Sequence, residues 1–573
     1  MSDSHSRQGR EHQGGRTLPD AVGADGGGDT GRGADGGPSP TATVERIAVA
    51  PGSSTERGGG TYRTFDEVQE ILSPTEQRLE RLRRTVGLFL GPLAGIAVYL
   101  ATGTLDEPAQ RLAGILVFVI VYWITEAIPI PVTAMLAISL VVIFSVAPAP
   151  EVFALFGNPT LFVFVGGFII AESMRKHGLD RRFAFGVLSL PGVGSSVVRI
   201  IIAFGAITAL LSGFVSNTAT AAMMMPIGVG IVTFIAGVMS AESGKELDPR
   251  RLRFATALML MVAYGASVGG LLTPVGSPPN LIGRGLIEEA TGETIPFFTW
   301  MVLAFPIVLL MFVALCFILI ALNRPETKRI SGVEEYVRLE REQLGPMGRG
   351  GRNTLIAFGV AVVLWVTPGV VALFTGGEGE FYESVLARMN EGAVAVVAAS
   401  LLFLLPIDFS RRQFTISWND AAKIDWGTIL LFGAGITLGS LLGSTGLAER
   451  MGGALSDLLG VSSLLGLTLL ATVIAVIISE TTSNTASVGV VVPIVIPLAE
   501  AAGVNPVIPA VAAIFGASFG FMLPVSTPPN AIVYGTGMVP IMKMVRSGIV
   551  FDIVGIVLIV AGVMAMGAVL GLG

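Results

Sequence analysis

The sequence predicts an all-α polytopic membrane protein with an inverted repeat, about 11 transmembrane helices and two re-entrant hairpins. Of its 573 residues, 52% are hydrophobic and only 14% are charged, which is too apolar for a soluble protein of this length. Apolar stretches of about 20 residues, the length of a helix that crosses a bilayer, recur along the chain. A polar tripeptide, Ser-Asn-Thr, occurs twice inside this apolar sequence.

The order of the elements follows from these apolar stretches. Residues 1–75 are rich in Gly, Ser, Asp and Arg and lack apolar periodicity, so we expect a disordered N-terminal tail. Eleven spans are expected at about 86–103, 111–127, 130–148, 152–174, 254–283, 299–322, 353–374, 391–408, 427–444, 506–535 and 548–572. Two broken regions, at about 184–240 and 462–501, hold the Ser-Asn-Thr motifs and are expected to form the hairpins.

Two copies of one unit account for these motifs. The stretches 212–227 and 479–494 agree at seven positions with a constant offset of 267 residues. Ser-Pro-Pro-Asn at 277–280 also matches Thr-Pro-Pro-Asn at 527–530 with an offset of 250 residues. Each copy therefore contains a span, a hairpin with Ser-Asn-Thr, and a span broken at Pro-Pro-Asn. The copies cover residues 152–283 and 427–535.

Charged residues are sorted between alternate loops. Basic residues gather at 81–84, 175–182 and 245–253, whereas intervening loops carry carboxylates such as Asp106 and Glu293. The positive-inside rule then predicts a multi-pass protein of the cell (inner or plasma) membrane with a cytoplasmic N-terminus. For the charge of successive loops to alternate between positive on the cytoplasmic side and negative outside, the first hairpin must enter the membrane from the cytoplasm and the second from outside. This topology requires an inverted repeat, as the sequence offsets indicate independently.

The residue types in the motifs suit a binding site. Ser, Asn and Thr place hydroxyl and amide groups at a hairpin tip, where the free N–H groups of a starting helix favour an anion. The same oxygens, with carbonyls freed where Pro-Pro interrupts a helix, can hold Na+. Asn280 and Asn530 can tie the broken ends together. A single Ser-Asn-Thr in a membrane helix more often joins helices, but its duplication favours a site.

No Lys or Arg lies beside either motif in the sequence. A divalent anion bound there would need a compensating charge, because an unpaired buried charge is very costly. Bound cations are the simplest source of that charge. The residues therefore predict cation-coupled anion transport.

Other polar residues point away from catalysis. The single cysteine, Cys316, and the three histidines exclude a cysteine cluster and argue against a zinc site. Three carboxylates lie in or near apolar sequence. We expect a hinge or interface role for Glu126 and a local ion pair with Arg175 for Glu172, whereas Glu480, beside a hairpin tip, is as consistent with function as with structure.

These motifs resemble those of the divalent anion:sodium symporter family, the relatives of dicarboxylate, citrate and sulfate carriers. The resemblance covers about 86–573 and rests on Trp-Ile-Thr-Glu-Ala-Ile-Pro at 123–129, the two hairpins, and the long segment 517–533. It implies a homodimer in which a transport domain moves against a scaffold as an elevator. Residues 76–151 and 284–426, with a cytoplasmic loop at 323–352, would form scaffold helices 1 to 3 and 6 to 8. Residues 536–573 would form the last transmembrane helix.

The resemblance also implies the site residues. The carboxylates of the substrate would meet both motifs and the break that follows the second, at Ser216, Asn217, Thr218, Ser483, Asn484, Thr485, Thr527 and Pro528. One Na+ would lie at Ser212, Ser216, Asn217 and Gly276, and another at Ser479, Thr482, Asn484 and Ser526. Ser479, Thr482 and Ser526 depart from the family in side chain, although ligation by backbone carbonyls would survive such changes.

We therefore expect a secondary active transporter, not an enzyme, that carries a C4-dicarboxylate such as succinate with Na+. Its partners would be the small-molecule dicarboxylate, sodium ions, the lipid bilayer and a second copy of the chain, without nucleic acid. The alternatives are a dicarboxylate exchanger (an antiporter) and a sodium:sulfate or sodium:citrate symporter. A passive anion channel fits the two hairpins less well. A membrane enzyme fits least, because the spans lack paired carboxylates or a His cluster.

Overall fold

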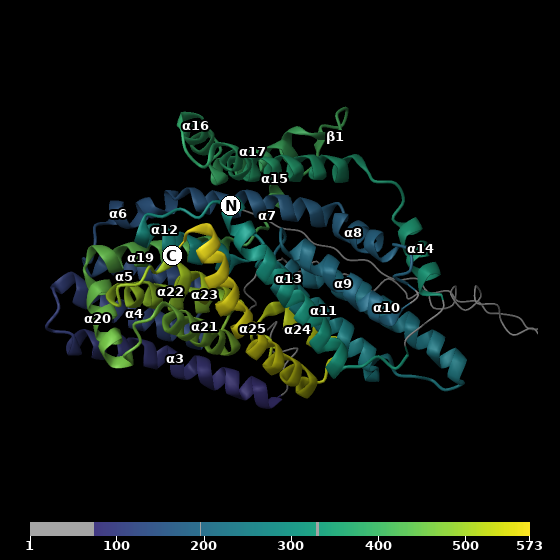
Figure 1. The fold of residues 1–573 in the computed structure, drawn as a ribbon, viewed down its shortest axis with the longest axis horizontal. Coiled ribbons are helices and arrows are strands. Elements are labelled where there is room, and N and C mark those ends of the chain that lie inside the picture. The colour runs from purple at the N-terminus through teal and green to yellow at the C-terminus, as the bar shows by residue number, and fades with distance from the viewer. Residues whose placement is uncertain (1–73, 195, 328–331, 573) are drawn as a thin grey trace, which may run out of the picture. The chain divides into compact units, whose positions relative to one another are not determined.

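The structure is a computed structural model that describes residues 74–194, 196–327 and 332–572 (Figure 1). Within these residues the chain is helical apart from two short antiparallel strands, β1 (Pro406–Asp408) and β2 (Gln413–Phe414). The prediction of an all-α protein is therefore confirmed. The predicted disordered tail, 1–75, lies outside the described residues except for its last two, which begin the first described helix.

Five helical elements precede the first repeat. They are α3 (Pro74–Ala101), α4 (Glu107–Thr125), α5 (Ile130–Ile143), α6 (Ala149–Ala154) and the 3-10 turn η1 (Leu155–Gly157). α3 packs along α4 at a pair of glycines, Gly95 and Gly114. A Cβ atom on Gly95 would lie 2.8 Å from the Gly114 carbonyl oxygen, so only glycine allows this approach.

The two repeats contain the same α-helices in the same order, and the first has in addition the 3-10 turn η2. The first comprises α7 (Pro159–Lys176), α8 (Leu179–Leu188), α9 (Val197–Ser212), α10 (Asn217–Ser243), η2 (Pro249–Arg251), α11 (Arg253–Gly270) and α12 (Pro278–Thr291). The second comprises α19 (Trp426–Ser444), α20 (Leu447–Leu459), α21 (Leu464–Thr481), α22 (Asn484–Ala501), α23 (Val507–Ala517) and α24 (Pro528–Tyr534). In both, a helix pair is divided at Ser-Asn-Thr and a later span is broken before Pro-Pro-Asn.

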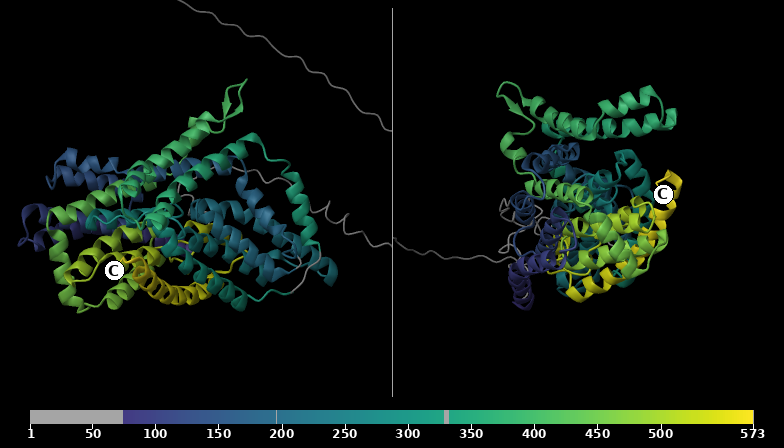
Figure 2. Two further views of the ribbon diagram at one scale, coloured as in Figure 1. Left: turned by 45° about the horizontal axis from the view of Figure 1, so that its top comes forward. Right: turned by 90° about the vertical axis from the view of Figure 1, so that its left-hand side faces the viewer.

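The remaining helices lie between and after the repeats. They are α13 (Phe297–Leu322), α14 (Val333–Gln343), α15 (Arg349–Thr375), α16 (Glu380–Arg388), α17 (Glu391–Leu404), α18 (Trp418–Ala421) and α25 (Ile541–Leu570). α15 and α17 lie side by side along one edge in Figure 1, next to α7. The β1–β2 hairpin projects beyond the end of α17 in both views of Figure 2.

The two repeats pack across each other. Within each repeat, the first hairpin helix runs along the broken span, as α9 on α11 and α21 on α23. Between repeats, α10 contacts α24 and α22 contacts α12. At the second of these contacts, a Cβ on Gly283 of α12 would lie 3.0 Å from Val488 of α22. Each hairpin therefore lies against a half-helix that the other repeat supplies.

Nine of the described helices are long and apolar enough to cross a membrane, or up to eleven if each of two bent helix pairs counts as one span. The upper number equals the predicted number of eleven spans, but the helices that it counts are not the same as the predicted spans. Three of the nine, α10, α21 and α22, belong to the hairpins. The helices of the two spans broken at Pro-Pro-Asn are not among the nine.

Gly166 offers a test of the packing between α7 and α17. A Cβ at Gly166 would lie 2.4 Å from the Ala395 carbonyl carbon and oxygen, so α7 would have to move away from α17. We predict that Gly166→Ala destabilises the protein by about 1–3 kcal/mol, the usual cost of overpacking. The thermal midpoint of the detergent-solubilised protein measures this. Gly435→Ala is the control, because a Cβ at Gly435 on α19 meets nothing within 4 Å; equal midpoints for the two variants would contradict the packing.

Candidate functional site

The first Ser-Asn-Thr motif forms the tip between α9 and α10. Ser216 caps α10, and its Oγ accepts a hydrogen bond from the Ala219 N–H at 3.4 Å. Ser212, at the end of α9, donates from Oγ to Oδ1 of Asn217 at 2.7 Å. The tip is therefore held by its own polar side chains. The first N–H groups of α10 have no acceptor within the helix and are left for other partners.

The second motif repeats these bonds between α21 and α22. Ser483 caps α22 and accepts from the Ala486 N–H at 3.2 Å. Ser479 donates from Oγ to Oδ1 of Asn484 at 2.9 Å and also lies 2.7 Å from the Ala517 carbonyl oxygen. The sequence repeat is thus also a repeat of hydrogen bonds, at the same offset.

One asparagine in each repeat holds the broken span together. Nδ2 of Asn280 donates to the carbonyls ten and seven residues before it, both at 2.8 Å. Nδ2 of Asn530 makes the same two bonds in its own repeat, at 2.8 and 3.0 Å. This confirms the predicted tie between the broken ends. The other amide atom of each side chain, Oδ1, is buried without a hydrogen-bond partner among the described residues.

Backbone oxygens converge where the first hairpin meets its broken span. A Cβ on Gly276 would lie 2.6 Å from the carbonyl oxygen of Gly270, 2.8 Å from that of Gly213 and 2.9 Å from that of Ser212. Only a glycine fits among these oxygens. Asn217 borders the same region, with Nδ2 3.5 Å from Oγ of Ser277. The structure therefore brings Ser212, Asn217 and Gly276 together, as the sequence predicts.

The second hairpin meets its broken span in a related way. Oγ of Ser526 donates to the Glu480 carbonyl oxygen at 2.8 Å. A Cβ on Gly520 would lie 3.0 Å from the Ser479 carbonyl oxygen and 3.3 Å from Oδ1 of Asn484. The structure thus brings Ser479, Asn484 and Ser526 together around Gly520. Gly520 was missed from sequence, although it matches Gly270 at the offset of the Pro-Pro-Asn pair.

Thr482 is turned into the hairpin. Its side chain is buried, and its Oγ1 lies 3.0 Å from both the Ile478 carbonyl oxygen and Oγ of Ser487. Any contribution from Thr482 to a site beside Ser526 would therefore come from its backbone.

Burial differs among the predicted site residues, of which Ser216, Asn217 and Asn484 were assigned to both the anion and Na+. Ser216, Thr218, Ser483, Asn484 and Pro528, predicted to contact the anion, are partly exposed. Thr485 and Thr527 from the same set are buried. The residues predicted only for Na+ are all buried, namely Ser212, Gly276, Ser479, Thr482 and Ser526. Asn217, assigned to both roles, is 8% exposed.

A basic side chain does reach the second hairpin, which corrects the expectation drawn from sequence. Nη1 of Arg83 on α3 donates to the Thr481 carbonyl oxygen at 2.7 Å, across 398 residues of chain. The charge of Arg83 is balanced by Glu80 at 2.8 Å and Glu126 at 3.5 Å. Arg83 therefore contacts the hairpin without supplying a free positive charge to it.

A second basic residue near the break in the first repeat is also neutralised. Arg284 of α12 is 3% exposed, and its Nη2 lies 2.6 Å from Oε2 of Glu391 on α17. Glu288 lies 3.3 Å away on the other side. With its charge already matched, Arg284 does not replace a cation at the motifs.

The three carboxylates singled out in the sequence have different surroundings. Glu172 pairs with Arg175 at 2.5 Å, as predicted. Glu126 ends α4 in a left-handed backbone conformation and pairs with Arg84 of α3 at 3.2 Å, which confirms a role at a helix interface. Glu480 is 3% exposed and bonds to backbone N–H groups of the second broken span.

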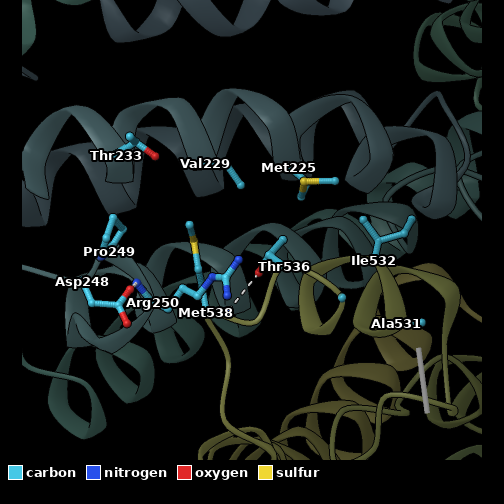
Figure 3. Close-up of a pocket in the computed structure, with 11 residues that line it drawn as sticks. Met225, Val229, Thr233, Asp248, Pro249, Arg250, Ala531, Ile532, Thr536 and Met538 are labelled. Atoms are coloured by element: carbon cyan, nitrogen blue, oxygen red, sulfur yellow. Dashed lines mark hydrogen bonds between the residues drawn. The ribbon is translucent and has the colours of Figure 1, made fainter. Parts of the chain in front are cut away.

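A cavity of about 650 Å³ lies between the repeats (Figure 3). Met225, Val229 and Thr233 line it from α10, and Ala531 and Ile532 line it from α24. Arg250 of η2 and Thr536 also face it. The place of Met225 beside the cavity could not be found from sequence, because nothing local shows that its helix faces the other repeat.

Comparison with known proteins identifies relatives over most of the chain. A protein named sodium-dependent dicarboxylate transporter SdcS from Staphylococcus saprophyticus is 33% identical over 505 residues, covering 87% of this chain and 95% of the relative. Its namesake from Staphylococcus aureus is 31% identical and covers 83% of this chain and 89% of the relative.

Two solved structures are more distant. They are the YdaH transporter from Alcanivorax borkumensis (13% identity, TM-score 0.45, 74% of this chain and 88% of that one) and MtrF from Neisseria gonorrhoeae (14% identity, TM-score 0.48, 80% and 95%). These scores are too low to add to the argument.

The match to a family model decides the family. The model described as the sodium:sulfate symporter transmembrane region matches residues 88–572, which include both hairpins and both broken spans. The chain therefore belongs to the sodium:sulfate symporter family.

Proposed function

We propose that this protein carries a C4-dicarboxylate such as succinate together with Na+ across the cell membrane. The observation that supports this most is the pair of Ser-Asn-Thr tips, each with the same capping and the same Ser-to-Asn hydrogen bond. Each tip presents the N-terminal end of a helix, so two tips can receive the two carboxylates of one substrate. The relatives named as sodium-dependent dicarboxylate transporters agree with this assignment.

The oxygens around the two breaks fit Na+. Three carbonyl oxygens converge on Gly276, and the Oδ1 atoms of Asn280 and Asn530 are buried without hydrogen-bond donors among the described residues. Unsatisfied oxygens such as these two Oδ1 atoms are costly in a membrane interior unless they bind a cation. Two Na+ ions would offset the two negative charges of the substrate. In this proposal, Na+ binds at the buried residues where each hairpin meets its broken span, and the dicarboxylate binds at the partly exposed tips.

Elevator movement in a homodimer is part of the same proposal. The moving unit would include the interlocked hairpins and broken spans, and α17 and α5 would belong to the scaffold. α7 packs on α17, and α19 packs on α5. The ion pair between Arg284 and Glu391 joins the first broken span to α17. Movement of the transport unit would have to exchange these contacts for others.

The cavity between α10 and α24 supports an arrangement open to the cytoplasm. Arg250, which the charge pattern places in a cytoplasmic loop, lines it. Ala531 and Ile532 line the same cavity, a few residues beyond Pro528. We therefore propose a cytoplasmic N-terminus and an approach to the site through this cavity.

Uptake into proteoliposomes tests the coupling. We predict that labelled succinate accumulates when Na+ is directed inward and fails to accumulate when choline replaces Na+, because the substrate charge is then unmatched. Uptake that is equal in both conditions would contradict Na+ coupling. Uptake that requires a dicarboxylate inside the vesicles, without net Na+ movement, would instead identify an exchanger.

Competition in the same vesicles tests the substrate class. We predict that unlabelled succinate reduces labelled succinate uptake more strongly than citrate or sulfate at equal concentration. The physical reason is that sulfate is too small to bridge two hairpin tips. Stronger competition by sulfate or citrate would overturn the C4-dicarboxylate assignment and favour the corresponding symporter.

Substitution of the hairpin asparagines tests the site. Asn217→Ala and Asn484→Ala each remove an amide that accepts from a serine and faces the broken span. We predict that each variant loses Na+-dependent uptake by about 100-fold or more, equivalent to about 3 kcal/mol for a lost buried polar contact. Asn505→Ala is the control, because Asn505 only accepts a bond from the Val507 N–H before α23. Wild-type rates in either hairpin variant would remove the assignment.

A further inference from the structure

Glu480 is held by hydrogen bonds from the second broken span. Its Oε1 accepts from the Phe521 N–H at 2.6 Å and from the Met522 N–H at 3.0 Å. Its Oε2 accepts from the Met522 N–H at 3.1 Å and from Oγ of Ser526 at 3.1 Å. Backbone N–H donors of this kind favour the charged form of a carboxylate. Glu480 therefore places a carboxyl group, with both oxygens hydrogen-bonded, on the buried side of the second hairpin.

A second carboxylate, Asp552 of α25, faces Glu480. α25 lies directly on the broken span, because a Cβ on Gly548 would be 2.7 Å from the Met522 nitrogen. Asp552 follows one helical turn later, and its carboxyl group lies against that of Glu480. Asp552 is 4% exposed, and neither Oδ1 nor Oδ2 has a hydrogen-bond donor among the described residues.

The surroundings of this pair exclude water. Phe521 and Phe551 lie beside it with ring centroids 4.9 Å apart, and Phe519 lies 5.6 Å from Phe551. Tyr264 packs on Phe521 and Phe551, with ring centroids 4.8 Å and 6.4 Å away. No ion pair among the described residues includes Glu480 or Asp552. Two facing carboxyl groups can both be charged in such a place only if a cation offsets their charge; otherwise they must share a proton.

We propose that Glu480 and Asp552 form a further Na+ site, separate from the two sites assigned to the hairpins and occupied during transport. The carboxylate oxygens of both residues would be its ligands, and Oγ of Ser526, assigned above to the second hairpin site, lies 3.1 Å from Oε2 of Glu480 and borders both sites. Hard oxygen ligands with net negative charge suit a small alkali cation. The site lies where α25 meets the second broken span, so its occupancy would stabilise that contact.

This inference rests on the proposed Na+ coupling and adds one ion to it. With the membrane potential set to zero, each coupled Na+ multiplies the limiting accumulation ratio of substrate by the Na+ gradient. In an about tenfold Na+ gradient, losing one ion therefore lowers the accumulation ratio about tenfold. We predict this loss for Asp552→Asn, which keeps the shape of the side chain and removes its charge. Ser547→Ala, a buried change on the same helix, is the control and should keep the wild-type ratio.

Thermal unfolding in detergent gives an independent reading of the same site. Na+ that binds the folded protein raises its melting temperature. We predict a smaller rise for Asp552→Asn than for wild type when NaCl replaces choline chloride, and a higher melting temperature for the variant in choline alone. Asp552→Ala serves in place of Asp552→Asn if the latter is poorly folded.

The outcomes separate this site from the proposed function. If wild type shows no Na+-dependent accumulation, the proposed function fails. The further site is then tested only by comparing the Na+-dependent rise in melting temperature of wild type with that of Asp552→Asn. If wild type is Na+-coupled and Asp552→Asn keeps the full accumulation ratio and the full melting shift, the further site is overturned. A proton flux, seen with a pH-sensitive dye inside the vesicles and lost in Asp552→Asn while Na+ dependence is unchanged, would also overturn it, because the occupant would then be a proton.

Discussion

The rest of the structure depends on how broken helices are stabilised inside a membrane. A helix that stops in an apolar interior leaves N–H and carbonyl groups without partners, at a cost of several kcal/mol for each unsatisfied group. Here the two breaks are bridged by Asn280 and Asn530. Each asparagine donates to the carbonyls ten and seven residues before it. The polar atoms left over are therefore few and fixed in place. They lie beside the hairpin tips, where a transported ion can complete their coordination.

Charge balance is the second constraint that organises the buried residues. Arg284 is matched by Glu391 and Glu288, and Arg83 is matched by Glu80 and Glu126. Neither arginine has spare charge for a divalent anion. The two buried carboxylates at Glu480 and Asp552 have no basic partner among the described residues. The protein thus needs cations at one place to bind an anion and at another to offset its own carboxylates.

Much of the fold and part of the site could be predicted because the chain is duplicated. The offset of 267 residues aligned Ser212 with Ser479, the offset of 250 residues aligned Asn280 with Asn530, and each pair makes equivalent bonds. The contact of Arg83 with Thr481 spans 398 residues and has no local pattern, so it could not be predicted. Asp552 was missed for a similar reason: it lies against Glu480 of another helix, and no local sequence pattern shows this contact. The position of Met225 in the cavity could be predicted only by knowing which face of α10 turns toward α24.

The proposal depends most on one claim: dicarboxylate binding requires Na+, because the part of the chain that the structure describes brings no uncompensated basic residue to the hairpin tips. Equilibrium binding of labelled succinate to the purified protein tests it most directly, since no gradient, voltage or movement is involved. The account predicts saturable binding in NaCl and loss of binding when choline chloride replaces it at equal ionic strength. Binding of equal affinity in both salts would contradict it, because the substrate charge would then be matched by the protein alone.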